Sequence, residues 1–262
     1  MKRGKFMGTN RKVKKWAGVL IILILLIVLT VKNAGYEKQC IAEMNNITVL
    51  SSESEFRTAL NGEPQTCIVE NATLTGYPVK DLYDIFNDEM IYICGDRQLC
   101  KRDNNSRRWR NAPDNYDDLV STKNWVYSDV EIPLTSFRIS GYPNDLKKYC
   151  KSSVTSKIEG TFYYPKGDLS KRVGNVRHNI ECIPQNSKVT FIAVVGNDSV
   201  SLKGLSVKNN AKLVIGGSAD SLKKEYTTGY RSTTYAAWLI GIVSIFFILI
   251  LGSDRARARR RR

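Results

Sequence analysis

The sequence has a single histidine, His178, and lacks the short motifs that mark common catalytic sites. GxSxG, P-loop, HExxH and GxGxxG patterns are all missing, which removes the usual signatures of hydrolases, nucleotide-binding enzymes and zinc proteases. No Cys-x-x-Cys pair occurs either, so a zinc site has no support from cysteine spacing. We therefore expect a protein that is not an enzyme and that holds no metal and no cofactor.

Two stretches of the chain have no charged residue. Residues 16–31 lie between Lys15 and Lys32, and residues 232–253 precede an arginine-rich end. About 20 apolar residues in a helix cross the roughly 30 Å hydrocarbon core of a membrane. The stretches therefore predict transmembrane helices at 16–32 and 232–253. A buried core helix is the alternative for the second. A cleaved signal peptide is the alternative for the first, although Lys32 makes the sequence after it a poor cleavage site.

Positive charge is concentrated at the two ends of the chain. The formal net charge is +15, with seven Lys or Arg in residues 1–15 and six Arg in residues 254–262. Such charge flanks membrane spans on the cytoplasmic side, so both tails are predicted to be cytoplasmic, next to the lipid bilayer. An arginine-based retention signal is an alternative for the second tail. The anchoring charges are assigned to Lys12, Lys14, Lys15, Arg255, Arg257, Arg259, Arg260, Arg261 and Arg262.

This topology leaves residues 33–231 as one domain outside the cytosol. All six cysteines of the chain lie in it. An even number of cysteines in an oxidising compartment is typical of a disulfide framework, whereas free thiols in a reducing compartment are the alternative. The candidates for disulfide bonds are Cys40, Cys67, Cys94, Cys100, Cys150 and Cys182.

The hydrophobic pattern of residues 33–231 predicts a mainly β, α+β fold. Ser52 and Glu55 form a capping-box pattern, which predicts a helix over 53–61. Alternating or β-branched runs between Gly and Pro residues predict strands. These strands are expected at 66–74, 90–94, 125–134, 158–164, 188–195, 200–208 and 211–215.

Residues 95–115 are polar and basic, with Trp109 among arginines. Arginine and tryptophan can stack on nucleic-acid bases. We favour a solvated hairpin or loop with Trp109 in the core, because a domain outside the cytosol meets little nucleic acid. No nucleic-acid partner is therefore expected.

One pair of residues offers an alternative to a non-enzymatic protein. Residues 176–182 are predicted to form a strand, which places His178 and Cys182 on the same face. A cysteine activated by a histidine is a common nucleophile. A membrane-tethered thiol enzyme that uses Cys182 and His178 is the resulting alternative.

The order of elements resembles that of the mitochondrial ubiquitin-ligase family with the GIDE, or beside-a-membrane, domain. Two places carry the resemblance: residues 56–72, which look like the helix and first strand of that domain, and residues 182–196, which look like a later strand and turn. Residues 162–177 are also similar to transmembrane protein 43. The ligases carry a RING domain with zinc ligands after the second span, and no Cys or His follows residue 253 here. The resemblance therefore implies a binding or sensing domain and no ligase activity.

These observations predict a non-enzymatic, two-span membrane protein. Its disulfide-stabilised domain would contact a protein partner or a second copy of itself, and an adhesin or receptor is a related alternative. The membrane is predicted to be a bacterial inner membrane, a eukaryotic endomembrane or a mitochondrial membrane.

Overall fold

The computed structural model describes residues 6–260 apart from 82, 105, 113–119, 122–123 and 134–136. Side chains are described between residues 21 and 245, without 120–121, 229, 231–234 and 244 as well. The chain forms two compact units. The helical unit comprises Met1–Asn46 with Lys223–Arg262, and the β unit comprises Ile47–Leu222.

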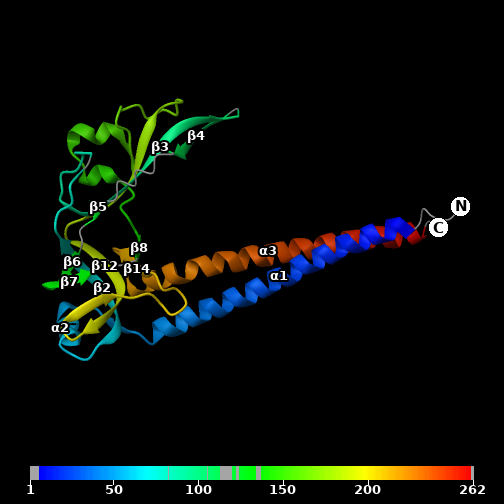
Figure 1. The fold of residues 1–262 in the computed structure, drawn as a ribbon, viewed down its shortest axis with the longest axis horizontal. Coiled ribbons are helices and arrows are strands. Elements are labelled where there is room, and N and C mark those ends of the chain that lie inside the picture. Colours follow the sequence, from blue (N-terminus) through cyan, green and yellow to red (C-terminus); the bar gives the residue numbers. More distant parts are fainter. Residues whose placement is uncertain are drawn as a thin grey trace. The chain divides into compact units, whose positions relative to one another are not determined.

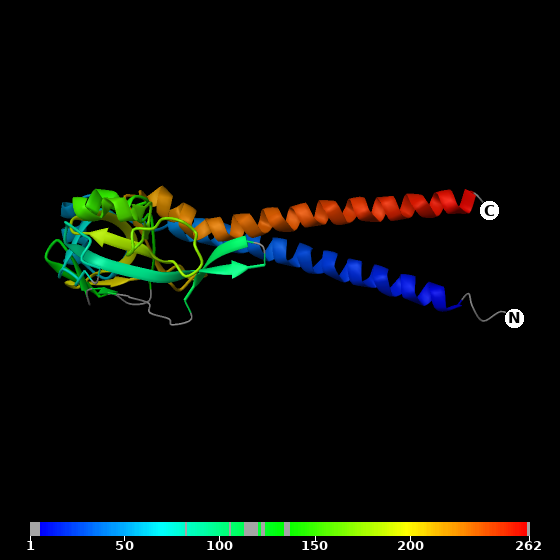
Figure 2. The same ribbon diagram turned by 90° about the horizontal axis from the view of Figure 1, so that it is seen from above.

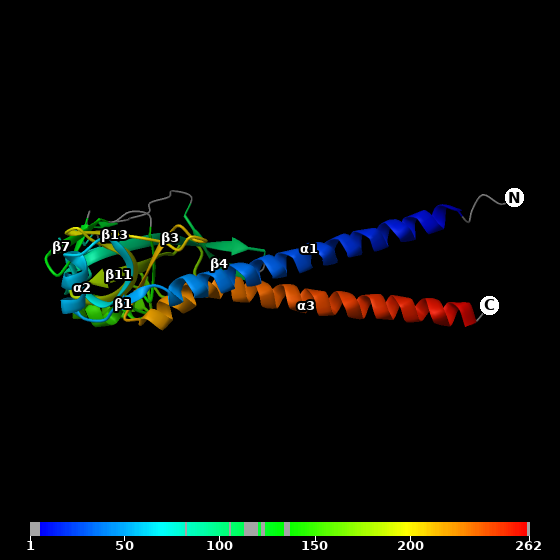
Figure 3. The same ribbon diagram turned by 90° about the horizontal axis from the view of Figure 1, so that it is seen from below.

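Two long helices make up the helical unit: α1, Phe6–Asn45, and α3, Ala219–Arg260. Figures 1, 2 and 3 show both as continuous helices. They contact each other in antiparallel order. Lys223, near the start of α3, donates to Asn45 Oδ1 at the end of α1 (2.6 Å), and the rings of Tyr36 and Tyr230 lie 5.7 Å apart.

The predicted transmembrane spans are not supported. A span needs one long helical run of apolar residues with hardly any charge, and the described residues of α1 and α3 contain no such run. On this finding the predictions of two transmembrane helices and of an integral membrane protein with both termini in the cytoplasm are wrong. The anchoring charges in tails 1–15 and 254–262 lie outside the residues whose side chains are described, as do parts of both predicted spans.

The β unit contains two sheets and short helices. In the first sheet the strands run in the order β7-β6-β2-β12-β14-β8, with β1 on β2 and β13 on β12. In the second sheet the order is β4-β3-β11-β10-β9, with β5 on β3. The strands of the first sheet are β1 Thr48–Leu50, β2 Gln65–Gly76, β6 Asn124–Tyr127, β7 Val130–Pro133, β8 Phe137–Ser140, β12 Ser187–Gly196, β13 Ser199–Leu202 and β14 Ala211–Ile215. Those of the second are β3 Met90–Asp103, β4 Ser106–Asn111, β5 Val120–Ser121, β9 Ile158–Glu159, β10 Phe162–Tyr163 and β11 Val176–Pro184. Two 3₁₀ helices, η1 Leu146–Tyr149 and η2 Ser152–Lys157, lie between β8 and β9.

Helix α2, Glu53–Leu60, confirms the predicted capping box. The Ser52 hydroxyl accepts from the Glu55 backbone N–H, and the Glu55 carboxylate accepts from the Ser52 backbone N–H (3.2 Å). Two of the N–H groups that a helix start leaves without partners are thereby satisfied. The apolar side of the helix is buried, and it comprises Phe56, Ala59 and Leu60.

Of the strands predicted after residue 187, those at 188–195 and 211–215 are confirmed, whereas the strand predicted over 200–208 ends at Leu202. β12 and β13 form an antiparallel hairpin whose turn, Asn197 and Asp198, has positive φ angles of 50° and 56°. A two-residue turn with positive φ at both positions matches the right-handed twist of hairpin strands. β12 pairs with β2 on its other side, so it lies at the centre of the sheet.

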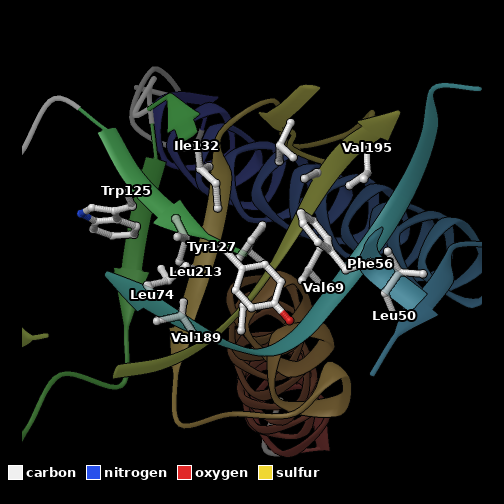
Figure 4. Close-up of a cluster of buried hydrophobic side chains, with 14 of the residues drawn as sticks. Leu50, Phe56, Val69, Leu74, Trp125, Tyr127, Ile132, Val189, Val195 and Leu213 are labelled. Atoms are coloured by element: carbon white, nitrogen blue, oxygen red, sulfur yellow. The ribbon is translucent and has the colours of Figure 1, made fainter. Parts of the chain in front are cut away.

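The first hydrophobic core of the β unit lies between the first sheet, α2 and residues of β3 and β11. Figure 4 shows Phe56 of α2, Val69 and Leu74 of β2 and Trp125 of β6 in this core. A second core lies on one face of the second sheet. It comprises Ile85, Phe86, Met90, Ile93, Leu146, Cys150, Ile158, Tyr163, Ile180 and Cys182.

None of the six predicted disulfide cysteines, Cys40, Cys67, Cys94, Cys100, Cys150 and Cys182, forms a disulfide bond. The prediction of disulfide bonds is therefore wrong, and the geometry of β3 and β11 gives part of the reason. Cys94 pairs with Glu181 and Cys182 with Ile93, so the two thiols lie on opposite faces of the sheet. Cys94 and Cys100 are separated by roughly 20 Å of extended strand, well beyond the ~7 Å limit for a disulfide.

Candidate functional site

The candidate site is the face of the second sheet that lies opposite its buried core. Arg177 of β11 pairs with Gln98 of β3, which pairs with Asn111 of β4, so these residues form one row across three strands. Residues two positions along each strand share that face. We call it the Arg177 face, and its members include Asp96, Gln98, Cys100, Arg102, Arg107, Trp109, Asn111, Phe162, Arg177 and Asn179.

Arg177 is held between two aromatic rings. Its guanidinium carbon lies 3.6 Å from the centre of the Phe162 ring and 4.5 Å from that of Trp109. A cation over the face of an aromatic ring is attracted by the electron density of the ring. Nε donates to Gln98 Oε1 (2.8 Å) and Nη1 to the Tyr164 hydroxyl (3.4 Å). The plane and position of the guanidinium are therefore fixed.

Arg177 makes no ion pair within the described part of the chain, where its contacts are to rings and neutral oxygens. The Tyr164 hydroxyl donates in turn to Glu159 Oε2 (3.1 Å). The carboxylate of Glu159 is therefore linked to Arg177 only through the Tyr164 hydroxyl. Burial raises the pKa of Tyr164, which keeps its hydroxyl neutral and able to donate. The site thus carries a fixed positive charge that no carboxylate contacts directly.

The β3–β4 hairpin extends the positive charge of this site. It carries six basic residues and two acidic ones between Asp96 and Asn111. The long strand β3 and its partner β4 are seen in Figures 2 and 3. Most of these cations are exposed. The Asp103 carboxylate accepts from Arg110 Nη2 (2.8 Å) and lies 3.6 Å from Arg108 Nε.

The register of the hairpin places like charges opposite each other. Arg102 pairs with Arg107, and Lys101 pairs with Arg108. Directly opposed residues on neighbouring strands have Cβ atoms about 5 Å apart, and like charges there are destabilising. Arg107 donates to the Lys171 carbonyl (3.2 Å), and neither Arg102 nor Lys101 has an ion pair among the described residues. An anion bound at the tip of the hairpin would relieve this repulsion.

His178 and Cys182 lie on the other face, toward the second core. They share that face, as predicted, but they are four residues apart in a regular strand, roughly 13 Å, which is too far for proton transfer. The ring nitrogen Nδ1 of His178 is 3.2 Å from the Tyr83 hydroxyl instead. Burial raises the pKa of Cys182 to about 12, and the pKa of Cys150, in the same core, is also raised to about 12. These thiols stay protonated at neutral pH, and a protonated thiol is a poor nucleophile.

Sequence reasoning missed the Arg177 face. The segment 95–115 was expected to be a hairpin or loop with Trp109 in the core, whereas the ring of Trp109 is half-buried and packs against Arg177 and Tyr164. Arg177 itself was passed over, although its alternation with His178 along a predicted strand already placed it on the opposite face. Its aromatic partners come from two other strands, so no local pattern indicated the stack.

The described residues contain no group of three or more His, Cys, Asp or Glu side chains arranged to hold a metal ion. Comparison of the chain with protein-family models, with curated proteins and with solved structures found no match, so the resemblance to the GIDE-domain family stays a prediction.

Proposed function

We propose that the β unit is a non-enzymatic binding module whose β3–β4 hairpin and Arg177 face bind an acidic segment of a partner protein. The observation that carries this proposal is the like-charge register of the hairpin, in which Arg102 is paired with Arg107 on the Arg177 face and Lys101 with Arg108 on the opposite face. A hairpin gains no stability from such pairs. Carboxylates that a partner places on the two faces of the hairpin form charge-assisted hydrogen bonds with these residues.

An acidic protein segment suits this face better than nucleic acid does. Single-stranded nucleic acid is bound largely by stacking of bases on open aromatic rings. Here one face of Phe162 and one face of Trp109 are covered by the Arg177 guanidinium, and Trp109 meets Tyr164 edge to face (ring centres 6.0 Å apart). The exposed groups that remain are guanidinium and ammonium groups, which recognise carboxylates by charge and by paired hydrogen bonds.

The test is a fluorescence-anisotropy titration of the full chain with a labelled peptide rich in Glu and Asp. We expect the double variant Arg107→Gln/Arg108→Gln to bind at least about tenfold more weakly, a loss of about 1.4 kcal/mol. Two variants with the same change in charge serve as controls. Arg138→Gln/Lys166→Gln removes two exposed charges elsewhere in the β unit. Arg260→Gln/Arg261→Gln removes two charges from the arginine-rich end of the sequence.

The proposal fails if the tail variant weakens binding as much as the hairpin variant, or if neither changes it. The single variant Arg107→Glu separates binding from folding. It replaces a repulsive cross-strand pair with an attractive one, so we expect it to stabilise the β unit by about 0.5 kcal/mol. The same variant is expected to bind the acidic peptide more weakly than the wild type. A loss of both stability and binding would instead assign Arg107 a structural role.

A further inference from the structure

An apolar groove runs between α1 and α3 in the helical unit. It has a volume of about 350 Å³ and is lined by α1 side chains from Leu23 to Val31 and by α3 side chains from Ala237 to Ile245. Among the described lining residues Thr30 alone carries a hydroxyl, and that hydroxyl donates to the Leu26 carbonyl (2.8 Å). Trp238 adds an indole N–H, and the other described side chains of the lining are apolar, so the groove offers a ligand mainly apolar contact.

The dimensions of the groove fit an extended hydrocarbon chain rather than an α-helix. Leu23 and Val31 are eight residues apart, which is about 12 Å of helix. All the space between the side chains of the groove, its open side included, is about 780 Å³, and dividing this volume by that length gives a mean cross-section of at most about 65 Å². A helix with side chains is at least about 10 Å across, or roughly 80 Å² in section. A helix from a second copy of this chain is thus too wide to enter, whereas an extended hydrocarbon is not.

Gly241 keeps the groove open. A Cβ built at this glycine meets no atom within 4 Å, so the space beside it is empty of protein. Apolar side chains on both sides of the groove are exposed, among them Leu25, Val28, Leu239 and Ile242. A much smaller apolar cavity, about 150 Å³, already binds benzene in place of water. A ligand longer than the groove would continue along this apolar surface and bury more of it.

We propose that the groove binds one unbranched hydrocarbon chain of an amphiphile such as a fatty acid, with the polar head outside the groove. The burial of apolar surface on both ligand and protein drives binding. Because the Thr30 hydroxyl already donates to the Leu26 carbonyl, the indole N–H of Trp238 is the one other polar side-chain group among the described lining residues, and most of the contact is apolar. Discrimination therefore comes from chain length and shape.

The experiment titrates the full chain with a fluorescent polyene fatty acid below the concentration at which that probe forms micelles. We expect saturable binding of one probe per chain. Gly241→Leu fills the groove and should lower affinity at least about tenfold, with Gly241→Ala in between. Gly35→Leu is the matched control, because Gly35 is an exposed glycine of α1 whose added Cβ also meets open space but which does not line the groove.

Equal binding by the wild type and Gly241→Leu, or binding that never saturates, would overturn the proposal. Sedimentation of the same proteins measures their oligomeric state, and so tests whether a second copy of this chain fills the groove instead. A wild-type dimer that Gly241→Leu dissociates would show that a second copy fills the groove, which also contradicts the proposal. Circular dichroism of each variant reports helix content, and the graded Ala and Leu series ensures that one groove variant keeps the fold.

Discussion

Replacing Trp125 with alanine is expected to destabilise the β unit by about 3 to 5 kcal/mol. The indole is fully buried in the first core, its ring centre lies 5.7 Å from that of Phe137, and its Nε1 donates to the Ile91 carbonyl (3.4 Å). Trp125 (Figure 4) belongs to β6 of the first sheet, and Ile91 belongs to β3 of the second. The substitution therefore leaves a cavity and removes a hydrogen bond between the two sheets.

Chemical denaturation of the full chain, followed by near-ultraviolet circular dichroism, measures this loss. Tyr77→Ala is the matched control, because Tyr77 is a large aromatic residue of the same unit that is 77% exposed. We expect the control to change the free energy of unfolding by less than about 0.5 kcal/mol. A loss below about 1 kcal/mol for Trp125→Ala would contradict a shared core between the sheets.

Gly196→Ala is the second substitution for which we expect a large loss of stability, about 3 kcal/mol or more. Gly196 ends β12 with φ of 150°, a conformation that side chains with a Cβ rarely adopt. An added Cβ would lie 2.6 Å from the backbone N and Cα of Pro64 and 2.7 Å from the carbonyl carbon of Glu63. Because those atoms are backbone atoms, they cannot move aside as a flexible side chain would.

Gly216→Ala is the control that separates the steric clash at Gly196 from the backbone cost of a positive φ. Gly216 also has a positive φ, 63°, but an added Cβ there meets nothing within 4 Å. We expect a loss of only about 1 kcal/mol, the backbone cost of a left-handed residue. Thermal unfolding of the two variants side by side measures the difference. Equal losses would mean that the contact between the end of β12 and the Glu63–Pro64 backbone contributes nothing to the fold.

The parts of the fold that could be predicted are those determined by nearby residues. The capping box at Ser52 and Glu55 specifies α2 locally, through two side-chain hydrogen bonds. The strands at 188–195 and 211–215 form as predicted, and the strand predicted over 200–208 forms only up to Leu202. In each case the signal lies within a few neighbouring residues: a cap for the helix, and alternation of apolar and polar residues for the strands.

The candidate site could not be predicted in this way, because no local pattern defines it. β4 reads Ser-Arg-Arg-Trp-Arg-Asn, which is polar on both faces, so hydrophobic alternation is missing although the segment pairs with β3 over its whole length. Phe162, Trp109 and Arg177 meet through strand pairing across three strands, and pairing partners are set by tertiary structure.

The cysteine prediction failed for a related reason. It rested on the count of cysteines, which says nothing about which side of a strand each thiol occupies, and Cys94 and Cys182 turn out to lie on opposite faces. The transmembrane prediction rested on composition too, and the described residues of α1 and α3 do not sustain it.

Residue-by-residue arginine modification most directly tests whether the β3–β4 hairpin binds acidic partners. The full chain is treated with an arginine-selective dicarbonyl, with and without a saturating acidic peptide, and each arginine is read by mass spectrometry. We predict that modification of Arg102, Arg107 and Arg108 slows at least about fivefold, since a guanidinium paired with a carboxylate is shielded. The exposed Arg138 and the arginines of residues 255–262 should keep their rates. Protection confined to residues 255–262, or protection nowhere, would contradict the account.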